Sequence, residues 1–455
     1  MKGYPDRKGL IVLIALPRKS ILPLLVALVF IARAAQAALP PGNTVQQWNK
    51  IAEDTVVGSG AFQSEGFIYM AYVSAAVYDA VVAIEGGFEP YGPAIAAPAG
   101  ASVDCAIVEA AYRTLGYYFS SFPVLVTDLD ADHTEALSNL GGCTADGGAG
   151  TAVGLAAATN IIVLRTGDGR RTPIGVTSSF PTLPEGPGVW RLTPPFAAPQ
   201  VPWVGETRRF VLQSVDQFLP EPPPTLQSDE WIDAFNQIKA YGAATNSVRS
   251  VEQTTIARFW SANVIRQYNR VGRDVAFARG LNLLETARLA AMINLVGADA
   301  LMSVLHAKYH YLFWRPVTAI DPSMVIADGF GPVPGFNDGN LATAEQTGWR
   351  PLLTTPNHPE YPCAHCVITS AMAEVFRTFL GTNQFGLDLH GFDPAGPSGN
   401  LNAVRHFDMP NDLRQEVIDA RIWAGLHYHF SGVAGVVLGR DIATYDLRHA
   451  FRPIN

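Results

Sequence analysis

The chain has 455 residues, of which 48% are hydrophobic, so it can bury a large core in one domain or in two packed bundles. Lys and Arg together number 32 against 40 Asp and Glu, which gives a formal net charge of -8. This acidic balance argues against nucleic acid or an anionic membrane as the main partner. Cations that do converge are therefore expected to form a specific site.

The first 37 residues have the order of an export signal. Basic residues come first, a short apolar run follows from Ile21 to Ile31, and Ala35-Gln36-Ala37 forms a small-residue exit before Ala38. A helix that spans a bilayer needs roughly 20 apolar residues, so a cleaved signal is favoured over an uncleaved membrane anchor. We predict that residues 1–37 are a signal peptide and that the mature protein is secreted or otherwise extracytoplasmic, in a periplasm or outside the cell.

The mature chain is expected to stay out of the membrane. The first 37 residues hold six basic residues and one acid, so the rest keeps 26 basic residues against 39 acids, a net charge of -13. No later segment has the length and apolarity that we expect of a spanning helix. We therefore predict no stable membrane insertion after signal cleavage.

Residues 38–165 are predicted to form an N-terminal helical bundle. The segments 48–84 and 105–118 are rich in Ala, Val, Ile and aromatic residues and lack the period-2 alternation of strands. Export makes disulfides possible, and we expect Cys105 to pair with Cys143, because Cys143 lies in a Gly-rich loop that can adapt its geometry. The alternative is that both cysteines are buried free thiols.

The amino-acid composition changes between residues 166 and 229. Pro and Gly recur there and predict a long irregular connection. Helical patterns return at Glu230 and continue almost to the end, and strand-like segments are few. We therefore predict an all-α fold. It comprises two packed helical bundles, residues 38–165 and 230–455, joined by the Pro/Gly-rich connection at 166–229.

A long helix near residue 300 carries the first candidate functional pair. Asn282 and Glu285 have the spacing of a capping box at its start, and Pro316 marks where it must stop or kink. If Lys308 and Arg315 lie on the same helix, they are close to two turns apart and share a face, so both could bind one anion. A solvated basic face is the alternative, but the aromatic residues between them favour a pocket.

A proline-rich loop leads into the second candidate segment. Pro362 suits the start of an apolar helix that runs to about residue 380. The backbone N–H groups of Cys363 and Ala364 would then face an anion at the positive end of that helix. His365 in its first turn is placed to give a proton to a bound oxygen. The alternative is a histidine that only caps the loop.

The spacing of Cys363 and Cys366 also raises a redox or metal role. A thioredoxin-type motif needs a surrounding βαβ pattern, which the sequence lacks. A zinc site needs two more well-placed ligands. We therefore favour neither.

The third candidate segment contains Arg421 and His427. Six residues apart on one helix, they would point to different faces. We predict instead that a helix starting at Asp412 ends at Gly425 and that Ser431 caps the next helix, so that both side chains turn inward. The alternative is a core arginine paired with a carboxylate, next to an incidental histidine.

Together the three segments resemble the vanadium-dependent haloperoxidase and type 2 phosphatidic acid phosphatase superfamily. Its signature is Lys-x6-Arg-Pro, then Pro-Ser-Gly-His, then Ser-Arg-x5-His-x3-Asp. The match covers roughly the last third of this chain and keeps the order of the segments. Soluble members of this superfamily are built of helical bundles, which agrees with the helical patterns of this sequence.

The resemblance implies a role for each matching residue. Lys308, Arg315 and Arg421 would neutralise the oxygens of a bound oxyanion. His427 would be either the sole protein ligand of vanadate or a nucleophile that forms a phosphohistidine, and His365 would handle the proton of the reacting oxygen. The resemblance also assigns contacts with the oxyanion to Cys363 and to the N–H of Ala364.

Four positions depart from the signature. Cys363 and Ala420 stand where the superfamily has Ser, and Ala364 stands where it has Gly. Hydroxyl donors are thereby lost, and a thiol donates only weakly. Ser431 occupies the place of the Asp that orients the histidine, so the imidazole of His427 must be held by a weaker partner or by another group.

The expected export and the segment 358–362 resemble the haloperoxidase branch rather than the membrane lipid phosphatases. We therefore predict a vanadium haloperoxidase-like enzyme, with vanadate as cofactor and with hydrogen peroxide and halide as substrates. A secreted acid phosphatase that needs no cofactor and acts on a phosphate monoester is the alternative enzyme. A non-catalytic oxyanion-binding module is the third possibility.

Overall fold

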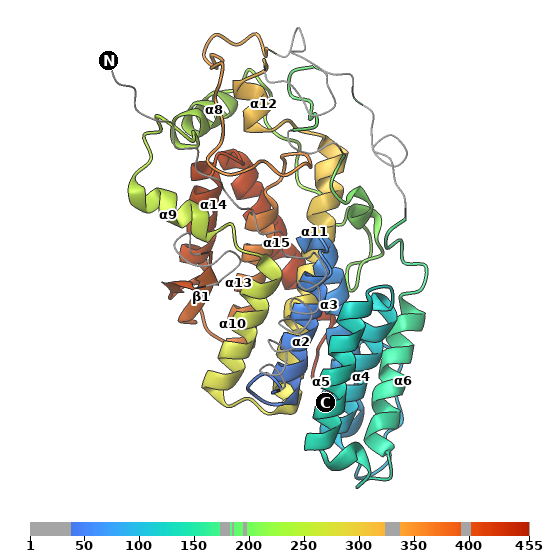
Figure 1. Cartoon of the computed structure of the whole chain (residues 1–455). Helices are drawn as coiled ribbons and strands as arrows, with labels where there is room; N and C mark the ends of the chain where they lie inside the picture. The colour runs from blue at the N-terminus through green and yellow to red at the C-terminus, as the bar shows by residue number, and fades with distance from the viewer. Residues whose placement is uncertain are drawn as a thin grey trace, which may run out of the picture. The chain divides into compact units, whose positions relative to one another are not determined.

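A computed structural model describes residues 38–172, 183, 186–193, 198–323, 337–392 and 402–454 (Figure 1). The predicted signal peptide, residues 1–37, lies outside the described residues. Residues 40–455 form one compact unit. Helices make up 58% of the described residues, which also contain one small two-stranded sheet. The predicted all-α fold is therefore confirmed.

Two of the helices in the first third of the chain start at a residue whose polar side chain caps them. Asn43 closes a capping box before the first of them, and the Ser102 hydroxyl accepts a hydrogen bond from the N–H of Cys105. The helices of this third confirm those expected within 48–84 and 105–118. They are α2 (Thr44–Gly58), α3 (Gln63–Glu85), α4 (Val103–Phe119), α5 (Pro123–Asn139) and α6 (Ala149–Leu164), with a 3-10 turn η1 (Gly141–Cys143) before α6.

The second half of the chain is arranged around α11 (Leu283–Tyr311), which packs against both α3 and α13. The predicted capping box at its start is confirmed. The Asn282 side chain accepts from the N–H of Glu285 at 2.9 Å, and the Glu285 carboxylate accepts from the N–H of Asn282 at 3.0 Å. The other helices are α8 (Asp229–Tyr241), α9 (Val251–Phe259), α10 (Val264–Arg279), α12 (Pro316–Ile320), α13 (Ala364–Leu380), α14 (Pro410–Trp423) and α15 (His429–His449).

A two-stranded antiparallel sheet precedes α14. Strand β1 (Leu387–Gly391) pairs with β2 (Ala403–Phe407), with Leu387 opposite Phe407. Three of the five β1 residues are buried, and β1 packs against α10. The sheet is therefore an attachment to the helical core and not a separate layer.

Two helices correct one expectation from the sequence. By length and apolar composition, both α3 and α11 could cross a membrane. In each, however, 89% of the most apolar 18-residue window is buried inside the protein. A helix that is apolar all round is also what the centre of a large core requires. The expected lack of membrane insertion stays a prediction.

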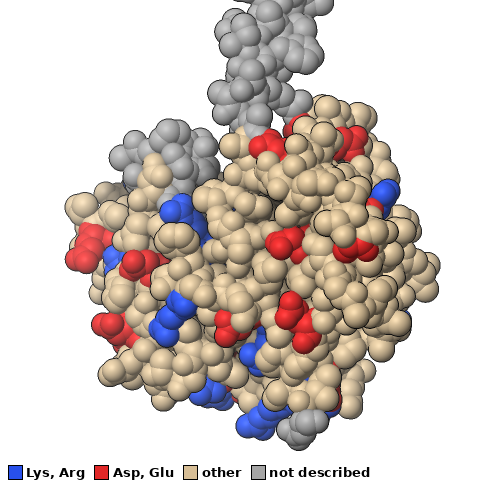
Figure 2. All heavy atoms as spheres, turned by 90° about the horizontal axis from the view of Figure 1, so that it is seen from below, with Lys and Arg blue, Asp and Glu red and all other residues tan. Residues whose placement is uncertain are grey.

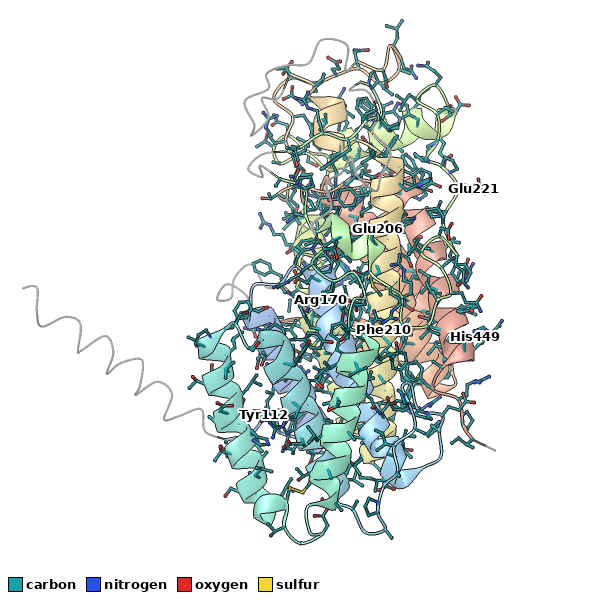
Figure 3. All side chains as sticks on the ribbon, turned by 90° about the vertical axis from the view of Figure 1, so that its right-hand side faces the viewer. Tyr112, Arg170, Glu206, Phe210, Glu221 and His449 are labelled. Atoms are coloured by element: carbon teal, nitrogen blue, oxygen red, sulfur yellow. A yellow bond between two sulfur atoms is a disulfide. The ribbon has the colours of Figure 1, made fainter. Side chains whose placement is uncertain are left out.

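A buried carboxylate on α11 fastens the Pro/Gly-rich connection to the core. Asp299 accepts hydrogen bonds from the backbone N–H groups of Phe210 at 2.7 Å, Val211 at 2.8 Å and Leu212 at 3.1 Å. Just before them, the 3-10 turn η2 (Pro202–Glu206) also packs against α11, and Figure 3 labels Glu206 and Phe210 on this segment. Where the structure describes it, the connection is irregular but held to α11. The boundaries at 165 and 230 stay predictions.

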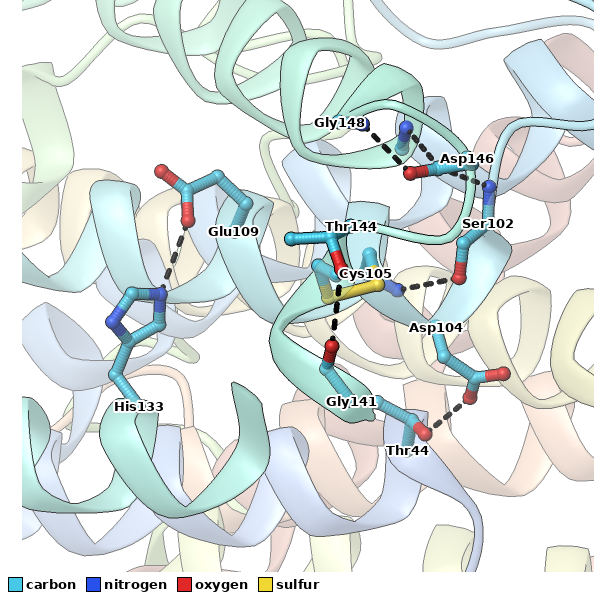
Figure 4. The surroundings of a disulfide bond; sticks show 12 residues. Thr44, Ser102, Asp104, Cys105, Glu109, His133, Gly141, Thr144, Asp146 and Gly148 are labelled. Carbon is cyan, nitrogen blue, oxygen red and sulfur yellow. Dashed lines mark hydrogen bonds and ion pairs between the residues drawn. A yellow bond between two sulfur atoms is a disulfide. The ribbon is translucent and has the colours of Figure 1, made fainter. Parts of the chain in front are cut away.

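Cys105 and Cys143 form the predicted disulfide, with their Cα atoms 5.8 Å apart (Figure 4). The Asp146 carboxylate accepts from the N–H groups of Ser102 at 2.8 Å and Gly150 at 2.7 Å, and so ties the Gly-rich turn to the start of α4. The bridge closes a sequence separation of 38. Chain-entropy arguments give such a loop a stabilisation of roughly 3–4 kcal/mol.

Charges are mixed over the surface face drawn in Figure 2. Basic and acidic side chains alternate there over short distances, and neither sign forms a continuous field. Such a face gives no strong electrostatic attraction for a polyanion. The expectation that nucleic acid is not the main partner stays a prediction.

Close contact between α13 and α15 depends on two glycines. A Cβ atom at Gly439 would lie 2.0 Å from the carbonyl oxygen of Val367, and one at Gly435 would lie 2.8 Å from that of Cys363. The missing side chains let the two helix backbones approach at the point where α13 begins. Any wider spacing would move the start of α13 away from the loop before α15.

Gly439→Ala should destabilise the protein by about 1–3 kcal/mol, the usual range for a group forced into a packed core. The added methyl group meets the backbone of α13, which cannot turn aside as a flexible side chain could. Val437→Ala, on the exposed side of the same helix, is the matched control and should change stability by less than about 0.5 kcal/mol. Chemical denaturation measures both, and equal stabilities for the two variants would contradict the packing argument.

Candidate functional site

The three segments singled out in the sequence meet at one buried place. Lys308 lies in the last turn of α11, and Arg315 immediately precedes α12. The loop 357–363 leads into α13, and the loop 424–428 joins α14 to α15. Lys308, Arg315, Arg421 and His427 are all buried.

Lys308 and Arg315 do not share a helix, which corrects the expectation of a continuous helical face. Helix α11 ends at Tyr311 because Leu312 adopts a left-handed conformation, with φ at 47°. The next residues leave the helix to meet the connection, where the N–H of Trp314 donates to the carbonyl of Gly188 at 3.1 Å. The two cations converge because the chain turns back, not because of helical periodicity.

The two cations hold the loop 357–363. The Lys308 ammonium donates to the carbonyl oxygens of Pro359 at 3.0 Å and Glu360 at 2.7 Å. Arg315 donates through Nε to the carbonyl of His358 at 2.9 Å and through Nη1 to that of Leu426 at 3.0 Å. Lysine has three N–H donors, so one remains to bind an anion.

His358, which the sequence analysis did not assign, adds to this arrangement. Its Nδ1 lies 3.0 Å from Arg315 Nη2. Burial and the charges of Arg315 and Lys308 hold its pKa well below the ordinary histidine value, so it is neutral and accepts from the arginine. It therefore orients the guanidinium without adding positive charge.

His427 lies between a carboxylate and a guanidinium. Its Nδ1 is 2.8 Å from Oε1 of Glu360, and its Nε2 is 3.3 Å from Nη1 of Arg315. The same Glu360 oxygen accepts the N–H of Tyr428 at 3.1 Å. The role of Glu360 was not predicted from the sequence. The only signal there is that Glu360 is an acidic residue in the loop 357–363, five positions before His365.

Ser431, which the sequence analysis expected to cap α15, lies inside its first turn. The helix begins at His429, with Tyr428 at the N-cap position. The carbonyl of Ser431 accepts the N–H of Cys363 at 3.1 Å, so this N–H does not face an anion, contrary to expectation. The bond instead joins the start of α13 to the start of α15.

Helix α13 begins at Ala364, with Cys363 as its N-cap residue. Its thiol sulfur accepts the N–H of Cys366 at 3.3 Å. Pro362 follows a cis peptide bond and lies before the helix, not in its first turn as predicted. Ala364 and His365 occupy that first turn, where backbone N–H groups have no partner within the helix.

Cys363 and Cys366 are both buried and free. Burial raises the pKa of Cys363, but its contacts with Cys366 and the charge of Arg421 outweigh that effect and leave the pKa below the ordinary value. Burial and the neighbouring Cys363 raise the pKa of Cys366 well above normal. Of the two thiols, Cys363 therefore has the lower pKa.

Arg421 lies in the last turn of α14 and donates to the carbonyl of Trp260 at 3.1 Å. The helix starts at Pro410 after Met409, not at Asp412 as expected, because proline supplies the first-turn geometry itself. The predicted exit at Gly425 is confirmed by its φ of 77°.

Burial dominates the electrostatics of the cluster. It lowers the pKa of Lys308 well below its ordinary value, with Arg315 as the next cause, and it lowers the pKa of Arg315 to about 10. It raises the pKa of Glu360 to about 7, while Lys308 and Arg315 oppose that rise. With Arg421, three buried cationic groups face one carboxylate, and such an excess favours an incoming anion.

The histidines of the cluster are neutral. Burial and the surrounding cations hold the pKa of both His427 and His365 well below the ordinary value. His365 Nε2 and Arg421 Nε are buried and have no hydrogen-bond partner among the described residues. Each is therefore available to a ligand.

These residues fit a tetrahedral oxyanion such as vanadate or phosphate. Unused donors remain on Lys308 and Arg421, and the start of α13 adds its free N–H groups. The described ranges contain no group of three His, Cys, Asp or Glu side chains suited to chelating a metal cation. What the cluster offers a ligand is its unused N–H donors and the neutral imidazole of His427.

Comparisons with known proteins agree with this geometry. Residues 288–455 match a family model described as the VCPO second helical-bundle domain. The vanadium chloroperoxidase of Curvularia inaequalis is 26% identical over 325 residues, covering 59% of this chain and 51% of that protein. The vanadium-dependent bromoperoxidase of Ascophyllum nodosum is 30% identical over 101 residues, covering 20% of this chain and 18% of that protein. The chain thus spans about half the length of the chloroperoxidase and less of the bromoperoxidase.

Solved structures match over a larger part of the chain. A bacterial vanadium-dependent iodoperoxidase aligns with a TM-score of 0.70 at 21% identity, covering 92% of this chain and 99% of that one. A bacterial vanadium-dependent chloroperoxidase in its holo form aligns with a TM-score of 0.63 at 15% identity, covering 88% and 93%. At these identities the likeness establishes the fold.

Arg421→Ala should weaken the binding of orthovanadate and of inorganic phosphate by at least about tenfold, since a charge-assisted hydrogen bond contributes on the order of 1.5–3 kcal/mol. Arg440→Ala, which removes an exposed arginine of α15, should leave both affinities unchanged. Isothermal titration calorimetry distinguishes these outcomes. Equal affinities in the wild type and in Arg421→Ala would mean that Arg421 does not bind the anion.

Proposed function

Because the chain belongs to the superfamily of vanadium haloperoxidases and type 2 phosphatidic acid phosphatases, we propose that it is a vanadium-dependent haloperoxidase that oxidises halide with hydrogen peroxide. The observation that carries the proposal is the setting of His427. Its Nδ1 is bonded to Glu360 and its Nε2 faces the cation cluster. The named activities of the similar proteins support the haloperoxidase branch.

In this proposal the cations and the histidines have separate tasks. Lys308, Arg315 and Arg421 would hold the vanadate oxygens, with the N–H of Ala364 and the weakly donating thiol of Cys363 beside them. His427 would bind vanadium through Nε2. Bound vanadate would supply the centre at which peroxide is activated towards halide.

His365 would handle the proton of the incoming peroxide. It is neutral at neutral pH, and its buried Nε2 has no partner among the described residues. A neutral imidazole accepts a proton first and can return it later. A negative charge placed near His365 would raise its pKa and make the imidazole a stronger base.

We also propose that the mature protein works outside the cytoplasm. The Cys105–Cys143 disulfide supports this, because structural disulfides persist mainly in oxidising compartments. The signal-like order of residues 1–37 points the same way.

Vanadate-loaded protein should oxidise bromide or iodide in the presence of peroxide, and His427→Ala should abolish this activity. After the metal is stripped, only added orthovanadate should restore it. The assay is halogenation of a reporter dye. A protein that instead hydrolyses a phosphate monoester without metal, and that vanadate inhibits as a transition-state mimic, belongs to the phosphatase branch. Tight vanadate binding without either activity would favour the non-catalytic module.

His365→Ala should lower the turnover by roughly 10² or more, the usual contribution of a positioned acid or base. Affinity for vanadate should stay within a factor of about two, because His365 carries no charge that the anion needs. His449→Ala, at the exposed end of α15, is the control. A turnover like that of the wild type would remove His365 from the mechanism.

A further inference from the structure

We propose that Glu360 is the positioning residue of His427, and that it replaces the aspartate missing at position 431. The Glu360 carboxylate holds the imidazole with its proton on Nδ1, so that Nε2 presents a lone pair to the oxyanion. The inference rests on the proposed function only for the identity of that anion. The placement of the proton follows from contacts within the protein.

Two neighbours independently require the same tautomer. Oε1 of Glu360 already accepts the N–H of Tyr428, so it also acts as the acceptor in its 2.8 Å contact with His427, which requires a proton on Nδ1. A guanidinium only donates, so the 3.3 Å contact with Arg315 requires a lone pair on Nε2. Both conditions are met by one neutral form of His427 and by no other.

Glu360 is itself firmly placed. Its side chain is fully buried. Its N–H donates to the carbonyl of Phe313 at 2.8 Å, and its carbonyl accepts from the Lys308 ammonium at 2.7 Å. Its carboxylate also accepts the N–H of Tyr428, so one oxygen fixes both the ring and the backbone next to it. A carboxylate held in this way can define the orientation of a ring.

Ser431 does not perform this task. It lies in the first turn of α15, and its carbonyl is bonded to the N–H of Cys363. In the superfamily signature the orienting acid comes four residues after the histidine. Here it comes from the loop before α13, 67 residues earlier than His427.

A positioning role and a purely electrostatic role predict opposite results for vanadate. If Glu360 were only a negative charge beside the cations, its removal would reduce repulsion and strengthen the binding of every oxyanion. If it positions His427, its removal should weaken the binding of vanadate, which needs Nε2. Phosphate held by the cations alone should bind as well as before or more tightly.

The first measurement needs no variant. In the full mature chain labelled with 15N-histidine, one nitrogen of His427 should carry a proton, and NMR should assign it to Nδ1. The signal is identified by its loss in His427→Ala. A proton on Nε2 of the wild-type protein would overturn the proposal, whatever the enzyme activity.

The second measurement compares Glu360→Leu with Glu360→Gln. The leucine variant removes the acceptor and should lose about ten- to a hundredfold in vanadate affinity, the usual cost of losing such a partner, without losing phosphate affinity. The glutamine variant keeps an acceptor oxygen at similar size and should recover most of the vanadate affinity. If both variants bind vanadate as tightly as the wild type or more tightly, Glu360 is only a counter-charge.

Glu206 provides a matched control, because its carboxylate lies 3.0 Å from Nδ1 of His306 on α11. This pair has the same chemistry but is partly exposed. Glu206→Leu should change neither the His427 signal nor the vanadate affinity. The two proposals can fail separately. If neither the wild type nor any of these variants oxidises halide, the proposed function is rejected. A proton on Nδ1 of His427 in the wild type would still support the positioning role of Glu360.

Discussion

The candidate site depends on the hydrogen bonds from the Lys308 ammonium to the carbonyls of Pro359 and Glu360. Lys308 lies at the end of α11, which packs on α3 and α13, so the loop takes its position from the core of the protein. The loop in turn supplies the carboxylate that contacts His427. A shift at the end of α11 would therefore change the position of His427 indirectly, through Lys308 and the loop that carries Glu360.

The buried charges explain why the site suits an anion. Each cationic group is moved out of water, which disfavours its charged form and lowers its pKa. One carboxylate cannot balance three such groups. An oxyanion restores the balance and accepts the donors that remain, so binding relieves a cost that folding has imposed. Neutral histidines complete the site because they add polar atoms without further positive charge.

The departures from the superfamily signature change the side-chain donors of the candidate site. Cys363 still caps α13, since its sulfur accepts the N–H of Cys366 as a serine hydroxyl would. What is lost is the strong hydroxyl donor, so in the proposed function the cations would supply more of the binding. The orienting carboxylate is kept, but Glu360 provides it from another segment of the chain.

Local signals in the sequence were sufficient for most of the helices and for the disulfide. Capping at Asn282, the apolar stretches of α3 and α11, and the exit at Gly425 each depend on a few neighbouring residues, so they can be recognised without the fold. Asp412 misled because Pro410, two residues earlier, already suits the first turn of α14. Pro362 and Ser431 misled where the starts of α13 and α15 meet, a contact between distant segments made by the N–H of Cys363 and the carbonyl of Ser431. Within the second half of the chain, only the tertiary structure brought Glu360 and His358 to His427 and Arg315. Their partners are 43 to 67 residues away, and no periodicity or spacing in the sequence records such a contact.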